Sequence, residues 1–198
     1  MKVDKSLPLE YSTEENSLKI LGFWIFIGAE IMLFATLFAS YFTLENRVGS
    51  GPSGAEIFEI TPVLIETLLL LTSSFTIGLA IHAMRLNRTK ATMTFFGITL
   101  LLGAAFLGVE IYEFVHYVHV GAGLQTSAFT AILLTTLGTH GLHVTFALFL
   151  GLFILLQIKK RGLTPETANK SFIFSLYWHF LDVIWIFIFS FIYLKGMM

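Results

Sequence analysis

Ionisable side chains interrupt several long apolar runs of this chain, and their chemistry needs an explanation. Five are acids, namely Glu30, Glu66, Glu110, Glu113 and Asp182. If the runs cross a bilayer, a charge at its centre costs at least about 2.5 kcal/mol on insertion scales. Each acid is therefore expected to be protonated, paired, lined by water or close to the interface. Two interpretations remain open: interhelical hydrogen bonds that fix packing, or a proton-handling role for at least one acid.

Glu30 lies near the middle of its run, and neither Lys nor Arg occurs in any of the five runs. Because burial disfavours a charged carboxylate, we expect Glu30 to be the neutral acid at neutral pH, hydrogen-bonded within the chain or against a partner. Glu66 and Glu110 lie near corresponding ends of two consecutive runs. At a rise of 1.5 Å per helical residue they reach a similar depth and could share one polar pocket.

Two pairs of polar residues have helical spacing. His140 and His143 are three residues apart, as are His179 and Asp182, so each pair shares a helix face. Such histidines could be axial haem ligands or metal ligands. They could equally be polar contacts that hold two helices together, with His179 and Asp182 satisfying each other. The residues alone leave both interpretations open.

Glu113 and His116 match the Glu-x-x-His pattern that di-iron helical bundles use in pairs, but only one copy occurs. It lies where an apolar run ends, so an interfacial polar cluster is the expected interpretation. Tyr177, Trp178 and Tyr193 lie towards the ends of the last run and predict an aromatic belt at the interface. Cysteine is absent, which excludes disulfides, Cys-ligated zinc and iron–sulfur clusters.

The elements that must position these residues are the apolar runs themselves. The chain of 198 residues is 56% hydrophobic and 13% charged, with a mean hydropathy of +0.80, whereas a soluble domain is about 25% charged. Each run has the roughly 20 residues that span a bilayer as a helix. We predict an all-α integral membrane bundle of five transmembrane helices, a single domain over residues 18–198 after a polar segment at 1–17. The predicted helices cover residues 20–42, 61–84, 93–115, 128–158 and 172–194.

The basic residues predict how this bundle is oriented. Ten of the twelve lie before the first run, between the second and third runs, or between the fourth and fifth runs. Only Arg47 and Lys195 lie at the opposite ends of the runs. By the positive-inside rule, the N-terminus is cytoplasmic and the C-terminus is outside. The net charge of −1 offers no basic face for nucleic acid.

Four stretches on four different predicted helices resemble subunit 3 of the haem–copper respiratory oxidases. They are LGFWIFIGAE at 21–30, GVEIYEF at 108–114, GTHGLHV at 138–144 and SLYWHFLDVIW at 175–185, in the family's order. Five helices match the compact bacterial form, which lacks the first two helices of the longer members. The stretch HYVHVGAGLQTSA at 116–128 is similar to the quinol oxidases of Gram-positive bacteria.

The resemblance implies a non-redox subunit of a proton-pumping terminal quinol oxidase in the bacterial plasma membrane. It implies no catalytic, cofactor or metal site in this chain, with haems and copper held by subunit 1. The main partner would be subunit 1, with subunits 2 and 4 and phospholipids, and the expected role is assembly, lipid binding and proton supply. Alternatives are subunit 3 of a cytochrome c oxidase, a cytochrome b anchor using His140 or His143 with His179, and a proton-coupled transporter using Glu30 and Asp182.

The resemblance also bears on individual residues. Glu30 matches the family's intramembrane carboxyl, which reacts with hydrophobic carbodiimides. His140, His143, His179 and Asp182 match positions that are structural. Glu66 and Glu110 stay candidates for a proton or packing role, and Glu113 and His116 for an interhelical polar network or a lipid contact.

Overall fold

The computed structural model describes residues 7–49 and 51–197 and is helical throughout its regular elements. Five long helices are α1 (Glu14–Leu44), α3 (Ile60–Arg85), α4 (Thr89–His119), α5 (Ala128–Arg161) and α6 (Pro165–Ile188). A short helix α2 (Gly54–Ile57) precedes α3, a 3₁₀ turn covers Leu9–Tyr11, and α6 continues as a π-helical segment, Phe189–Leu194. All five long helices are long and apolar enough to cross a membrane.

Helices α1 and α6 begin before their predicted apolar runs, because capping residues start them in polar sequence. Thr13 accepts a hydrogen bond from the backbone of Asn16 at the start of α1. Thr164 caps α6 in the same way through the Thr167 backbone, and Pro165 occupies the first turn, where no donor is needed. At the C-terminal end of α5, Gly162 adopts a φ of 70°, a conformation that favours glycine and ends the helix.

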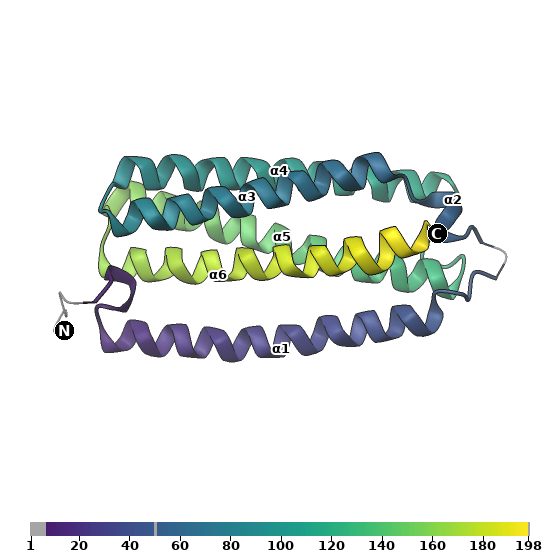
Figure 1. Ribbon diagram of the computed structural model, residues 1–198, viewed down its shortest axis with the longest axis horizontal. Helices are drawn as coiled ribbons and strands as arrows, with labels where there is room; N and C mark the ends of the chain where they lie inside the picture. The colour runs from purple at the N-terminus through teal and green to yellow at the C-terminus, as the bar shows by residue number, and fades with distance from the viewer. Residues whose placement is uncertain (1–6, 50, 198) are drawn as a thin grey trace.

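The long helices run side by side, each antiparallel to the next along the chain (Figure 1). α6 packs against α1, α3 and α5, and α4 packs against α3 and α5. Half of the most apolar stretch of α6 is buried, against 17% of that of α1. α6 is therefore the central helix, and α1 lies at the edge with most of its apolar surface open.

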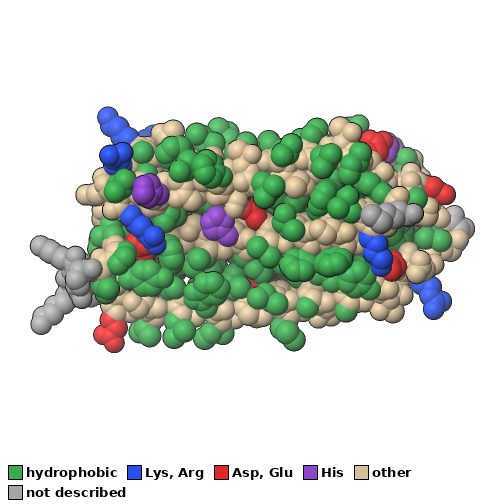
Figure 2. All heavy atoms as spheres, viewed as in Figure 1, with side chains coloured by type: hydrophobic (Ala, Val, Ile, Leu, Met, Phe, Trp, Pro, Cys, Tyr) green, Lys and Arg blue, Asp and Glu red, His purple; other side chains and the backbone are tan. Residues whose placement is uncertain are grey.

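The two ends of the bundle differ in charge. Figure 2 shows one face, on which Lys and Arg side chains lie only at the ends and apolar side chains cover most of the surface between them. We call the end with the α3–α4 and α5–α6 loops the basic end, because it carries eight basic residues: Lys19, Arg85, Arg88, Lys90, Lys159, Lys160, Arg161 and Lys170. We call the other the α2 end; it carries Arg47 and Lys195. Lys2 and Lys5 of the predicted basic set lie outside the described residues.

The described residues before α1, 7–13, are tied to the basic end of the bundle through Glu10. Glu10 is fully buried, and its Oε1 accepts a hydrogen bond from Nε of Arg85 at 2.8 Å and forms a salt bridge with Nη2 at the same distance. Asn169 Nδ2 donates to the backbone oxygens of Glu10 and Asn16. This polar clasp joins the N-terminal segment to α3 and α6.

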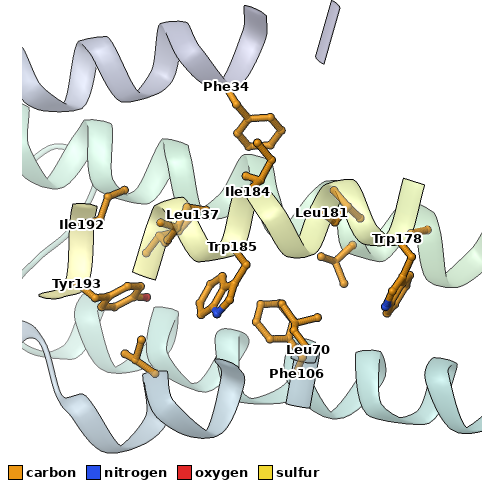
Figure 3. Packing of buried hydrophobic residues seen from close by; sticks show 14 of the residues in the cluster. Phe34, Leu70, Phe106, Leu137, Trp178, Leu181, Ile184, Trp185, Ile192 and Tyr193 are labelled. Atoms are coloured by element: carbon orange, nitrogen blue, oxygen red, sulfur yellow. The ribbon is translucent and has the colours of Figure 1, made fainter. Parts of the chain in front are cut away.

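Large aromatic side chains fill the core, several of them on α6 (Figure 3). The Trp185 ring meets Phe106 edge-on, with centroids 4.8 Å apart, and its Nε1 donates to Thr67. Trp178 donates to Ser73, and its ring lies where a Cβ on Gly103 would stand. The interfacial belt predicted for Tyr177, Trp178 and Tyr193 is wrong, because all three are buried against neighbouring helices.

Candidate functional site

The intramembrane acid Glu30 is paired with a histidine from another helix. Its Oε2 lies 3.0 Å from Nε2 of His143 on α5. The other ring nitrogen, Nδ1, lies 2.6 Å from the backbone oxygen of Thr139. The sequence does not indicate His143 as the partner of Glu30, because 113 residues separate the two.

The Thr139 carbonyl determines how protons are arranged in this pair. A carbonyl oxygen only accepts, so Nδ1 of His143 must carry a proton. Nε2 then either accepts a hydrogen bond from a neutral Glu30 acid or, in an imidazolium, donates to a Glu30 carboxylate. In both arrangements the pair shares one proton and has no net charge, which makes it tolerable in an apolar bundle.

This pair faces a groove on the outside of the bundle. Side-chain exposure is 13% for Glu30 and 20% for His143. The groove holds about 220 Å³, and its lining is completed by Phe26, Leu142, Phe146 and Tyr177. The carboxyl is thus reachable from the lipid side or by a neighbouring protein, and apolar surface surrounds it.

The remaining histidines of α5 and α6 are held separately. His140 is fully buried, and neither ring nitrogen has a hydrogen-bond partner among the described residues. His179 Nδ1 lies 2.7 Å from the hydroxyl of Ser74 on α3. Both carboxylate oxygens of Asp182 are buried without a described partner, so the expected contact between His179 and Asp182 does not form.

These surroundings do not fit axial haem ligation by His140 or His143 with His179. Both nitrogens of His143 are engaged. The His140 ring is packed against Phe34, Phe106 and Trp185, with centroids 5.5–6.5 Å away. A macrocycle beside it would have to displace these core rings. Nor does any group of three or more His, Cys, Asp or Glu in residues 7–49 and 51–197 come together as a metal site.

A second group of acids lies in the half of the bundle nearer the α2 end. Glu66 on α3 is fully buried, and Glu110 on α4 is 4% exposed. The Glu66 carboxylate is near enough to those of Glu110 and Glu113 to interact with both electrostatically. The Glu110 carboxylate lies against α5 at Gly141, where a Cβ would stand 2.7 Å from Oε2.

Glu113 and His116 have different partners. Glu113 is 4% exposed, and its Oε2 accepts hydrogen bonds from Tyr117 at 3.1 Å and Tyr193 at 2.8 Å. His116 is at the surface, 4.0 Å from Glu59. The Glu-x-x-His pattern is therefore not a ligand pair here. The four-residue spacing from Glu113 to Tyr117 could have been found in the sequence, whereas nothing local pointed to Tyr193.

Comparison with known proteins identifies the family of this chain. The family model described as cytochrome c oxidase subunit III matches residues 12–197. This chain belongs to the cytochrome c oxidase subunit III family. Its relatives in that family include the quinol oxidase subunit 3 of Bacillus spizizenii, 57% identical over 98% of this chain and 95% of the relative.

Two further subunit III relatives have different names. The cytochrome c oxidase subunit 3 of Bacillus sp. PS3 is 49% identical over 96% of this chain and 92% of the relative. The probable quinol oxidase subunit 3 of Staphylococcus aureus USA300 is 47% identical over 96% and 94%. Membership of the family and five membrane-length helices together make this chain a multi-pass membrane subunit of a respiratory oxidase.

Proposed function

We propose that this chain is the non-redox subunit 3 of a haem–copper terminal oxidase that uses quinol as its electron donor. The observation that carries the choice of donor comes from one organism. Bacillus subtilis has a quinol oxidase subunit 3 that is 57% identical to this chain and a cytochrome c oxidase subunit 3 that is 47% identical. Subunits that serve the same donor are expected to resemble each other more.

In this proposal the chain contributes assembly, lipid binding and proton supply to a complex in the bacterial plasma membrane. Electrons pass from quinol to oxygen through haems and copper in subunit 1, with subunits 2 and 4 as further partners. The Glu30–His143 pair supports a role at a boundary, because it lies in a groove open to the outside of the bundle. A neutral pair that shares one proton is suited to contact with subunit 1 or with a phospholipid. If the pair releases that proton, it is left with a net negative charge.

The test is gentle detergent purification through a tag on this chain. We expect it to bring down a larger haem protein whose oxygen consumption is supported by quinol and not by reduced cytochrome c. Activity with cytochrome c alone would replace quinol oxidase by cytochrome c oxidase as the complex. A haem spectrum from the isolated chain, or uptake activity without partners, would instead support the cytochrome b or transporter alternatives.

A further inference from the structure

Three acids on two helices converge in the half of the bundle nearer the α2 end. Glu66 lies six residues into α3, and Glu110 and Glu113 lie nine and six residues before the end of α4. At 1.5 Å per residue these positions are roughly 9–14 Å from the helix ends. Their exposed fractions are 0%, 4% and 4%. We call Glu66, Glu110 and Glu113 the carboxyl cluster.

The hydrogen bonding within the cluster is incomplete in a specific way. Two tyrosine hydroxyls, of Tyr117 and Tyr193, donate to a single oxygen of Glu113. All four carboxyl oxygens of Glu66 and Glu110 are buried with no partner among the described residues. Ionised carboxylates in such a place would be desolvated without compensation, which is strongly unfavourable.

The groups that face the cluster are tyrosines, histidines and one further acid. Tyr117 comes from α4 and Tyr193 from the π-helical segment. His140 of α5 is next to Gly141, on which Glu110 lies, and its ring is enclosed by aromatic rings. At the outer side stand Glu59 and His116. No described Lys or Arg forms an ion pair with any of the three acids, so like charges would repel.

Water can approach the cluster from the α2 end. A pocket of about 20 Å³ is lined by Glu113 and Tyr117 at its inner side and by Glu59, Pro62 and His116, among others. This volume is enough for roughly one water molecule. The Glu59 and His116 side chains at its outer side are 67% and 38% exposed. Of the three acids, only Glu113 lines this pocket, so it stands between the pocket and the other two acids.

We propose that the carboxyl cluster is a buried proton-binding site that exchanges protons with the aqueous phase at the α2 end through the pocket beside His116. Hydronium in the pocket transfers a proton to the Glu113 carboxylate and leaves as water, and a proton held by Glu66 or Glu110 can return by the same route to water. No electron or covalent bond to carbon is involved. The site belongs to this chain alone and does not depend on which donor the oxidase uses.

The test is infrared spectroscopy of the purified, assembled complex in H₂O and D₂O. We expect a carbonyl band of a protonated glutamic acid that shifts in D₂O and disappears in Glu66→Gln or Glu110→Gln. Asp182→Asn, which alters a buried acid elsewhere, should leave that band in place. Isotope-labelled glutamate in the unmutated complex identifies the band without relying on a variant that might not assemble. Absence of any protonated glutamic acid band there would overturn the proposal.

The route is tested by the rate at which this band shifts after mixing with D₂O. His116→Trp, which covers the pocket, should slow the exchange severalfold. His119→Trp is the matched control, because His119 is an exposed neighbour outside the pocket lining. Equal rates in the His116 variant and the unmutated complex would overturn the pocket as the route. Loss of the band from Asp182→Asn instead of the glutamate variants would overturn the site.

Discussion

A single backbone carbonyl shapes the chemistry of the intramembrane pair. Because Thr139 holds the Nδ1 proton of His143, the proton between Glu30 and Nε2 can lie on either partner without changing the total charge. A mid-helix glutamate is thereby accommodated without Lys or Arg. Because Glu30 and His143 share this proton, a substitution of one residue is expected to change the hydrogen bonding of the other.

Glu30→Gln and Glu30→Ala separate this shared proton from simple packing. The Gln amide can still donate to His143 Nε2, so we expect normal assembly and most of the turnover. Ala leaves a part-buried imidazole nitrogen without its partner, at a cost of roughly 1–3 kcal/mol, and should lower the melting temperature of the complex. Thermal unfolding and proton uptake during prolonged turnover are the measurements.

The two variants also distinguish the arrangements of the pair. If Gln abolishes assembly as fully as Ala, a carboxylate facing an imidazolium is required. If Gln assembles normally but turnover decays early, Glu30 needs its exchangeable proton, and proton supply gains over packing.

Gly141→Ala tests the close approach of Glu110 to α5. A Cβ there would stand 2.7 Å from Oε2 and 2.9 Å from Oε1 of Glu110. We expect a loss of stability of roughly 1–3 kcal/mol from overpacking, measured by thermal or denaturant unfolding. Gly138→Ala on the same helix is the control, because its Cβ would meet the Phe114 ring at an ordinary 3.6 Å. Equal stability of the two variants would show that Glu110 does not lie against Gly141.

Histidines of α5 and α6 contribute to the packing between helices. His140→Ala removes a fully buried ring that packs against both Phe106 and Trp185, and His179→Ala removes the hydrogen bond to Ser74. We expect both variants to lower thermal stability or assembly while haem per assembled complex stays unchanged. Selective loss of one haem signal from an intact complex would instead favour a haem-binding role.

The N-terminal segment and the end of α3 form a second such junction. Arg85→Ala leaves the fully buried Glu10 carboxylate without its cation, so we expect the segment before α1 to detach and become sensitive to protease. Arg88→Ala, an exposed neighbour, should have no effect. Removing both charges with Glu10→Ala and Arg85→Ala should cost less than Arg85→Ala alone, since no buried charge is left unpaired. Protease resistance of the single variant would contradict the clasp.

At the scale of the whole molecule, the distribution of basic residues predicts the orientation in the membrane. Because the chain lacks cysteine, Asn46→Cys at the α2 end and Lys160→Cys at the basic end are unique labelling sites. We expect a membrane-impermeant thiol reagent to reach Asn46→Cys from outside intact cells and Lys160→Cys only after the cells are opened. Labelling of both from one side would refute the predicted topology.

Much of the architecture is local information that the sequence carries. Continuous apolar runs of bilayer length predict five spanning helices because every backbone polar group must be satisfied within a segment. The structure confirms these helices as long and apolar enough to span. The same reasoning identifies the unusual residues, since an acid or a histidine in such a run is costly wherever it points.

The tertiary structure decided which of these residues meet. The helices are apolar on almost all sides, so their sequences do not indicate which face turns inward, and helix rotation and register come only from packing. That packing brings His143 to Glu30 across 113 residues and Tyr193 to Glu113 across 80. It also buries the three aromatics that were predicted to lie at the interface. Sequence can name the polar groups of a membrane bundle, but their partners follow from how apolar side chains interlock.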